Sequence, residues 1–447
     1  MLRLGTLSAI LGRSRRYSTL PPTIRQLFAA PVPTDPTEIT VNGWIKSVRR
    51  QKRMSFAVLA DGTTDDGLQA VFSDPTLDLD SLTTGASVRL EGALVGSPGA
   101  RQDRELQVRS FSVVGQCDPE SYPIQRKELS TEFLRTLPHL RTRTQAHAHI
   151  IRERDRLMRG FHSYFETNGF YHIHTPALTQ NDCEGGGEAF ALAAPAPDMF
   201  GHPAYLTVSA QLHLEAMAAA LPRVYTLSPA FRAESSATSR HLSEFWMLEA
   251  ELAFADSLED IMALTEGCVR AVLPKASDTD PSPWPRITYA QAVDALAAAH
   301  PQVKFEYEPR HGDPLRSDHE RWLAEVWAND RPVFVTSYPA AHKPFYMLPN
   351  DDGTDTVACF DLLIPRVGEL AGGSLREHRL DRLQDAMKRH GVNERGELEW
   401  YLDLRRWGST PHGGFGLGFE RLVAFVTGTE SVKECVPFPR WAGRWLM

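Results

Sequence analysis

The stretch FRAESSATSRHLSEFWMLEAEL, residues 231–252, concentrates charged and hydroxyl side chains in a short span. Arg232 and Arg240 carry guanidinium groups, which pair bidentately with phosphate oxygens, and Phe245 offers a ring face on which a purine can stack. The hydroxyl-rich run SSATS favours a turn, so we predict a loop between two strands. Taken alone, this stretch fits a surface hairpin with incidental charge as well as it fits a nucleotide-binding loop. The other segments of the sequence have to decide between these two interpretations.

The composition of the 447-residue chain is typical of a globular protein, with 42% hydrophobic and 23% charged residues. A chain of this length is expected to form two or three domains. Its net charge of −8 excludes a uniformly basic nucleic-acid binder, so any polyanion has to meet a local patch. The five cysteines form no zinc-spaced cluster, which favours free thiols in a reducing compartment. No apolar run approaches the ~18 residues that span a bilayer, so no membrane is expected as a partner.

The first residues, MLRLGTLSAILGRSRRYSTLPPT (1–23), are rich in arginine and hydroxyl residues, and the first acidic residue is Asp35. This composition is typical of a mitochondrial transit peptide, which we predict over residues 1–20, with the protein in the mitochondrial matrix. A secretory signal is disfavoured because Gly12 and Arg13 interrupt the apolar region early. The remaining alternative is a disordered basic tail.

The next part of the sequence has the pattern of a small β-barrel. Five short segments alternate apolar and polar residues between Gly, Asp and Pro turns, which predicts five strands; they are 39–50, 54–62, 68–74, 86–96 and 105–115. Five such strands suit an OB-fold barrel over residues 36–117, which presents a strand face to oligonucleotides. A barrel with a purely structural role is the alternative.

A connector rich in proline and basic residues, 118–143, follows the predicted barrel. Apolar residues then recur at helical spacing until Gly169 ends the run. This helix opens a second domain, predicted over 144–447, in which extended and helical patterns mix.

Glycines cluster in PHGGFGLGFERLVAFVTG, residues 411–428. They match neither GxxxxGK[ST] nor a GxGxxG in a βαβ context, so neither a P-loop nor a Rossmann site is supported. Gly414, Gly416 and Gly418 permit close approach of the backbone to a ligand. Arg421 follows at once and can place a planar cation over a base or against a phosphate.

Two further segments carry carboxylates beside glycines. In CFDLLIPRVGELAGGSLREHRL, residues 359–380, Asp361 and Glu369 form the best carboxylate pair for Mg²⁺ on a nucleotide. Arg376 is a lone cation beside them. In TQNDCEGGGEAF, residues 179–190, Glu184 stands next to three glycines, where it can hold an ammonium group.

Three of these segments together resemble a known family. FHSYFETNGFYHIHTPAL (161–178), FRAESSATSRHLSEF with WMLEAE, and GLGFERL are similar, in this order, to the three motifs of the class II aminoacyl-tRNA synthetases. The resemblance runs from about residue 37 to 440. With the barrel in front, it points to the subgroup that charges Asp, Asn and Lys. It implies an α+β fold, an antiparallel sheet flanked by helices joined to an OB-fold barrel, and a homodimer, because the first motif belongs to an interface in this class.

Within the subgroup, details resemble the asparaginyl enzymes. SAQLHLEA (209–216) has Leu214 where the aspartyl enzymes carry a lysine, and Glu215 follows where asparaginyl enzymes use a glutamate. GELAGGSLRE, LRRWGSTPHGGFGLGFERL and PFPR match as well. A substrate amide needs one acceptor and one donor. Glu215 is expected to accept from the NH₂, Arg376 to donate to the C=O, and the glutamate charge to repel aspartate.

The resemblance implies ATP-dependent ligation of asparagine to tRNA(Asn) through an asparaginyl-adenylate, for mitochondrial translation. Arg232 and Arg421 are the expected catalytic residues, stabilising charge without any side-chain nucleophile. The expected ligands are: for ATP, Arg232, Glu234, Arg240, His241, Phe245, Glu369, Gly418 and Arg421; for asparagine, Glu184, Gln211, Glu215, Arg232 and Arg376; and for Mg²⁺, Asp361 and Glu369.

In the barrel, Phe56 and Gln69 stand where related enzymes contact the middle anticodon base. Arg49 and Arg50 belong to the basic run SVRRQKR (47–53), which fits the anticodon backbone. The alternative is a core aromatic at Phe56 and a solvated basic loop.

Three other functions remain open. An aspartyl enzyme is disfavoured by Leu214 and Glu215, and a tRNA-independent enzyme that amidates aspartate is disfavoured by the intact barrel. A paralogue that has lost its activity and serves as an RNA-binding protein is expected to lack a motif arginine, but Arg232 and Arg421 are both present.

Overall fold

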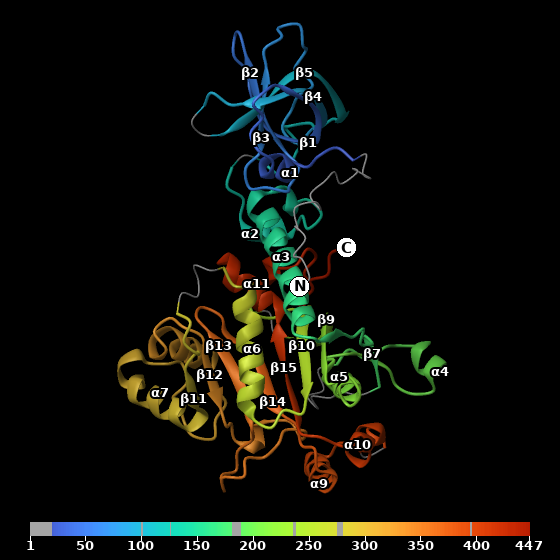
Figure 1. Cartoon of the computed structure of the whole chain (residues 1–447), viewed down its shortest axis with the longest axis vertical. Helices are drawn as coiled ribbons and strands as arrows, with labels where there is room; N and C mark the ends of the chain where they lie inside the picture. Colours follow the sequence, from blue (N-terminus) through green and yellow to red (C-terminus); the bar gives the residue numbers. More distant parts are fainter. Residues whose placement is uncertain are drawn as a thin grey trace, which may run out of the picture. The chain divides into compact units, whose positions relative to one another are not determined.

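The alternating pattern of residues 39–115 produces a closed five-stranded barrel (Figure 1). The computed structural model describes residues 20–99, 102–125, 127–180, 189–235, 238–274, 280–393 and 396–447. After a short helix, α1 (Ile24–Ala29), the strands are β1 (Thr37–Arg49), β2 (Ser55–Ala60), β3 (Leu68–Phe72), β4 (Ser87–Gly96) and β5 (Arg104–Gly115). They close in the order β1-β2-β3-β5-β4, with β3 and β5 parallel. The predicted OB-fold barrel and its five strands are confirmed.

The protein divides into two compact units, residues 1–149 and 150–447. Along the sequence, the barrel is followed by α2 (Thr131–Arg135), a 3₁₀ turn (Arg141–Arg143) and the long helix α3 (Gln145–Thr167). Gly169, with φ +76°, follows this helix, as predicted. No helix among the described residues is long and apolar enough to cross a membrane.

The second unit is built on an eight-stranded sheet with the order β11-β12-β13-β14-β15-β10-β9-β6. Its strands are β6 (Tyr171–His172), β9 (Arg223–Phe231), β10 (Glu244–Ala253), β11 (Arg286–Thr288), β12 (Val333–Thr336), β13 (Cys359–Ile364), β14 (Gly368–Leu375) and β15 (His412–Gly418). The middle of the sheet is antiparallel, as predicted. The edge strands β11 and β6 instead run parallel to their neighbours, so the sheet is mixed.

One face of this sheet is apolar and covered by helices. On β10, Leu248 and Ala250 belong to the main core, which Phe161 of α3, Ile261 of α6 (Leu258–Val272) and Phe419 of α11 (Phe419–Thr427) complete. Because strand side chains alternate between faces, Met247, Glu249 and Glu251 project from the other face. The binary pattern of β10 thus places Glu249 and Glu251 opposite the core.

Smaller elements surround the polar face and the sheet edges. They are β7 (Leu178–Thr179), α4 (Ala196–Phe200), β8 (Tyr205–Leu206), α5 (Gln211–Ala218), α7 (Tyr289–Val303), α8 (Ser317–Trp322), a π-helical turn (Leu323–Trp327), short 3₁₀ turns (Ala340–His342, Val432–Glu434), α9 (Leu380–His390) and α10 (Glu399–Arg406). Helices α7 and α8 share a separate apolar core with β11 and β12, and α9 packs with α10 in another.

Candidate active site

The predicted loop between two strands is present: residues 232–243 join β9 to β10, whose ends pair at Phe231 and Glu244. Residues 236 and 237 of the hydroxyl-rich run lie outside the described residues. The loop and the neighbouring strands enclose a cavity of about 190 Å³. All eight residues predicted to bind ATP line this one cavity: Arg232, Glu234, Arg240, His241, Phe245, Glu369, Gly418 and Arg421.

Opposite charges face one another inside this cavity. His241 Nε2 lies 3.3 Å from Glu234 Oε2, and Arg232 Nη1 lies 4.0 Å from Glu234 Oε1. Arg421 Nη1 donates to the backbone oxygen of Glu369 at 2.8 Å and approaches its carboxylate at 3.3 Å. Burial, together with the positive charge of Arg421, lowers the pKa of His241. The two walls therefore present guanidinium groups and an imidazole around an aromatic ring, a set suited to phosphates and a base.

Arg240 is held by a segment to which the sequence assigned no function. Its guanidinium donates to the hydroxyl of Ser317 and, at 3.0 Å, to Glu320 Oε2, both on α8. The same Glu320 oxygen accepts from the backbone N–H of Glu369 at 3.1 Å. Residues between 254 and 340 thus contribute a carboxylate that connects α8 to the edge of the cavity.

A second cavity of about 330 Å³ adjoins the first. It is lined by Gln211, Arg232 and Arg376, which were predicted to bind asparagine, and by both predicted Mg²⁺ ligands. Leu214 lines it as well. The two cavities share Arg232, Met247, Glu369 and Gly416. A group bound in either cavity therefore meets Arg232.

The two carboxylates predicted to hold Mg²⁺ flank one glycine. A Cβ at Gly372 would lie 3.5 Å from Asp361 Oδ1 and 3.7 Å from Glu369 Oε1. Lys343 Nζ donates to both oxygens of Asp361, at 3.0 and 3.2 Å. Burial alone would lower the pKa of Lys343, but the charge of Asp361 outweighs burial and raises this pKa.

Among the described side chains, no group of three or more His, Cys, Asp or Glu can hold a metal. Nucleotide-bound Mg²⁺ needs only one or two carboxylates beside the phosphates. Asp361 and Glu369 therefore fit Mg²⁺ that arrives with a nucleotide, provided that Lys343 moves off Asp361.

Arg376 is buried and paired with a residue that was not predicted, Glu251. Arg376 Nε and Nη2 donate to the two Glu251 oxygens at 3.2 and 3.1 Å, and Nη1 donates to Ser374 Oγ at 2.8 Å. Burial disfavours the guanidinium charge, but Glu251 and Glu215 raise the pKa of Arg376. Since Arg carries five N–H groups, two remain for a ligand.

The glycine opposite Glu251 makes this pair possible. Glu251 faces Gly414 across the β10–β15 ladder, and a Cβ at Gly414 would lie 2.1 Å from Glu251 Oε2. Gly414 was expected to admit a ligand, and in the structure it instead makes room for a protein carboxylate. The alternation of Glu249 and Glu251 with apolar residues in WMLEAEL was the available signal for this site.

The structure does not bring Glu215 into the second cavity. Glu215 is a buried residue of α5, and its Oε2 accepts from Tyr401 Oη at 2.7 Å, Arg405 Nη2 at 2.8 Å and His412 Nε2 at 3.1 Å. Its Oε1 accepts from Gln211 Nε2 at 3.1 Å. The predicted contact of Glu215 with the substrate amide finds no support in this geometry, because Glu215 is not among the residues that line the second cavity.

Two other predictions fall outside the described residues: Glu184 lies in the undescribed segment 181–188, and the predicted transit peptide lies almost wholly in 1–19.

In the barrel, the predicted tRNA residues Arg49, Phe56 and Gln69 share the surface opposite the core. Phe56 pairs with Arg49 on β1 and with Val71 on β3, while Gln69 pairs with Val58. Directly opposed residues point to the same face, and Ala57 and Leu59, which alternate with Phe56, belong to the barrel core. Phe56 is half-buried and is absent from that core among the described side chains. The structure therefore disfavours the core-aromatic alternative.

Gln69 and Arg50 also make polar contacts within the barrel. Gln69 Nε2 donates to Glu105 Oε2 at 3.2 Å. Arg50 lies 3.3 Å from Asp80 and donates to the Leu79 backbone oxygen.

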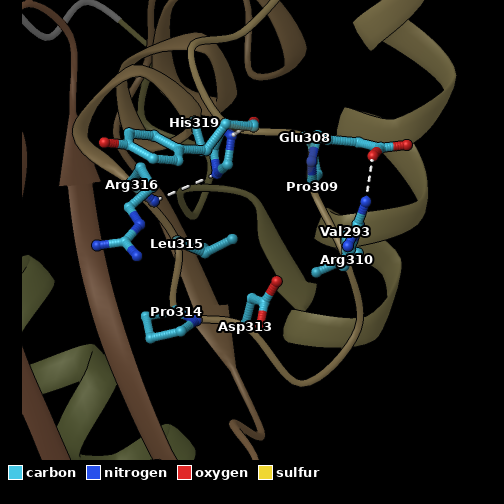
Figure 2. A pocket seen from close by; sticks show the side chains of 10 residues that line it. Val293, Glu308, Pro309, Arg310, Asp313, Pro314, Leu315, Arg316 and His319 are labelled. Carbon is cyan, nitrogen blue, oxygen red and sulfur yellow. Dashed lines mark hydrogen bonds and ion pairs between the residues drawn. The ribbon is translucent and has the colours of Figure 1, made fainter.

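A separate cavity of about 210 Å³ lies beside α7 and α8, and Figure 2 shows its lining. His319 Nε2 contacts the Tyr307 backbone oxygen at 2.9 Å, and its Nδ1 accepts from the Arg316 N–H at 3.2 Å. Glu308 pairs with Arg310 at 2.7 Å. None of the predicted site residues that the structure describes lines this cavity, and the polar groups just named pair among themselves.

Comparisons with known proteins agree with this arrangement. Residues 130–442 match the family model of the class II tRNA synthetases (D, K and N), and residues 39–114 match that of the OB-fold nucleic acid binding domain. The protein is 45% identical to the asparagine–tRNA ligase of Desulfotalea psychrophila, over 91% of its own length and 95% of the relative. It is 43% identical to the mitochondrial asparagine–tRNA ligase of Schizosaccharomyces pombe, over 95% and 98%.

Its fold is also similar to solved structures. The asparaginyl-tRNA synthetase of Pyrococcus horikoshii, complexed with asparaginyl-adenylate, superposes with a TM-score of 0.85 at 32% identity. The match extends over 96% of the present protein and all of the Pyrococcus one.

Proposed function

The protein belongs to the asparagine–tRNA ligases among the class II aminoacyl-tRNA synthetases, and from this premise we propose that it charges mitochondrial tRNA(Asn) with asparagine through an asparaginyl-adenylate. The observation that carries the proposed reaction is the pair of adjoining cavities with Arg232 in the wall of both. One cavity suits ATP and the other suits an amino acid. Their common wall is where the carboxylate has to meet the α-phosphate.

In this proposal Arg232 contacts both the α-phosphate and the substrate carboxylate. Its charge stabilises the negative charge that develops at phosphorus, and the two cavities supply the alignment. The ring centre of Phe245 lies 5.6 Å from the Arg232 guanidinium carbon, and this ring stacks on the adenine. Arg421 covers the other face of the adenine or holds the γ-phosphate. Arg240 and His241 meet the outer phosphates.

Asp361 and Glu369 would hold Mg²⁺, which supplies positive charge for the phosphates when bound. The protein's own residues do the rest of the positioning. Arg240 has to leave Glu320 to reach a phosphate.

For the amino acid, Arg376 donates to the amide carbonyl oxygen of asparagine. We assign the acceptor for the amide NH₂ to Glu251, because it lines the cavity beside Arg376 and Glu215 does not. Gln211 and, by the resemblance to the family, Glu184 receive the α-ammonium. Leu214 stands where the aspartyl enzymes carry a lysine, so the cavity lacks one of the cations that would pair with the carboxylate of a bound aspartate.

The test of this function is ATP–pyrophosphate exchange with each amino acid, followed by charging of tRNA(Asn). We expect exchange that depends on asparagine and transfer that depends on tRNA(Asn). Exchange with aspartate at a similar specificity constant would favour an aspartyl enzyme. Activity that forms free asparagine from aspartate without tRNA would favour the amidating enzyme.

A further inference from the structure

Two polar residues on α5 lie one helical turn apart and contact each other. Gln211 and Glu215 are an i, i+4 pair, and Gln211 Nε2 donates to Glu215 Oε1 at 3.1 Å. Gln211 lines the second cavity, whereas Glu215 lies behind it with 2% of its surface exposed. The pair therefore connects a residue that can touch substrate to one that cannot.

The surroundings of Glu215 keep it ionised. Its other oxygen accepts hydrogen bonds from Tyr401 and Arg405 on α10 and from His412 on β15. Burial alone would raise the pKa of Glu215, but the charges of Arg405 and His412 hold it well below its ordinary value. An ionised carboxylate only accepts hydrogen bonds, so it faces the NH₂ end of Gln211.

The amide of Gln211 is thereby fixed in one of its two orientations. An Asn or Gln amide can turn over, and the hydrogen-bond network decides which end faces which partner. With the NH₂ bound to Glu215, the carbonyl oxygen of Gln211 is directed away from Glu215, and it has no hydrogen-bond partner among the residues that the structure describes. A carbonyl oxygen on the cavity side is an acceptor suited to an ammonium group.

We propose that Glu215 is a positioning residue, which holds the Gln211 amide so that its carbonyl oxygen faces the α-ammonium of the substrate. This inference rests on the proposed function, because it takes an amino acid as the occupant of the cavity. It replaces the predicted role of Glu215 as the hydrogen-bond acceptor for the substrate's side-chain amide. Glu215 acts at the opposite end of the amino acid and only through Gln211.

The experiment compares two stable mimics of the adenylate on the full-length protein by titration calorimetry. One is 5′-O-(asparaginylsulfamoyl)adenosine, and the other is the same compound without the α-amino group. In Glu215→Gln, the residue at 215 can donate as well as accept, so the Gln211 amide is free to turn over. We expect the aminated compound to lose affinity by about tenfold or more, the size of a hydrogen bond to a charged group, and the compound without the amine to bind unchanged.

Two further variants separate positioning from folding. Gln211→Ala is expected to give the same selective loss, and combining it with Glu215→Gln is expected to add nothing, because both act through one hydrogen bond. Tyr401→Phe removes a donor to the other Glu215 oxygen but leaves the Gln211 contact, so it should keep the wild-type ratio of affinities. If Glu215→Gln does not fold, Glu215→Asp keeps the charge facing Arg405 and withdraws the oxygen from Gln211.

Several results would overturn the inference. Equal weakening of both compounds in Glu215→Gln would show a purely structural role. A gain in affinity of Glu215→Gln for 5′-O-(aspartylsulfamoyl)adenosine, titrated as a third compound, would show that Glu215 recognises the side-chain amide. Failure of the wild-type protein to bind either compound would overturn the proposed function and this inference with it.

Discussion

Arg232 is the residue on which the two cavities converge, so its removal should affect the chemistry more than the binding of either substrate. We expect Arg232→Ala to slow asparagine-dependent pyrophosphate exchange by ~10²-fold or more, the usual loss for one donor to a developing charge. Single-turnover formation of the adenylate at saturating ATP and asparagine measures this. A rate near that of the wild type would remove Arg232 from the proposed role.

Lys343 is a second residue whose position leads to a definite expectation. Its ammonium group forms an ion pair with Asp361, the carboxylate that a divalent cation would bind. We expect Lys343→Met to raise the affinity of the nucleotide-free protein for Mn²⁺ by about tenfold or more, because a buried competing charge is lost. Electron paramagnetic resonance of free Mn²⁺ measures it.

Lys388→Met is the matched control, since Lys388 is an exposed lysine on α9. An unchanged Mn²⁺ affinity in Lys343→Met would mean that the Lys343–Asp361 pair does not compete with the metal.

The residues that sequence reasoning found and those it missed differ in a physical way. Arg232, Phe245 and Arg421 lie in segments whose order and spacing resemble a family, and they line the cavity as expected. Glu320 and Lys343 reach the site from segments with no recognisable motif. Glu251 was overlooked because its partner, Arg376, is 125 residues away and the contact depends on the strand order of the sheet.

At the scale of elements, the barrel strands present a face that is independent of the barrel core. Phe56 and Gln69 lie on it, so Phe56→Ala should leave the barrel folded and weaken tRNA(Asn) binding by roughly 1–3 kcal/mol, the cost of losing one base-stacking ring. Filter binding of the tRNA measures the affinity, and asparagine-dependent pyrophosphate exchange without tRNA should not change.

Leu59→Ala provides the contrast on the same strand, because Leu59 is a fully buried core residue. It should lower the stability of the barrel by about 2–5 kcal/mol. If Phe56→Ala unfolded the barrel in the same way by circular dichroism, the core-aromatic alternative would return.

The strands that could be predicted were the long ones with regular alternation. The five barrel strands and the pair β9 and β10 follow their sequence patterns closely. Strands β6 and β11 have only two and three residues, too few to show a period. Their parallel pairing is decided by where the preceding segment enters the sheet, which no local pattern records.

At the scale of the whole molecule, strand β6 ends the sheet and leaves an unpaired edge among the described residues. Tyr171 on it is 60% exposed, and the helix before it, α3, carries the segment that resembles the interface motif of the class. We expect a homodimer, with a mass by analytical ultracentrifugation of twice the 49.9 kDa of the monomer. A monomer mass at micromolar concentration would contradict it.

The amino-terminal segment is the basis of the proposal that the enzyme works in mitochondria. Similar ligases in Schizosaccharomyces pombe and Saccharomyces cerevisiae are named mitochondrial, whereas others are bacterial. We expect residues 1–20 to carry a fused fluorescent protein into mitochondria, because arginines without acidic residues suit import along the membrane potential. Replacing the four arginines of this segment with glutamine is the control, and diffuse cytosolic fluorescence from the unaltered fusion would refute the targeting proposal.

The pairs that Lys343 forms with Asp361, and Arg240 with Glu320, bear on the search for inhibitors. A fragment that mimics phosphate must separate Arg240 from Glu320 before it can bind that guanidinium group, and a cation must displace Lys343 before it can bind Asp361. Screens of the empty enzyme will therefore favour uncharged fragments and miss those that mimic phosphate. Screening the enzyme already loaded with a nucleotide analogue and Mg²⁺ presents the asparagine cavity with its charges released, and compounds found there will compete with the amino acid.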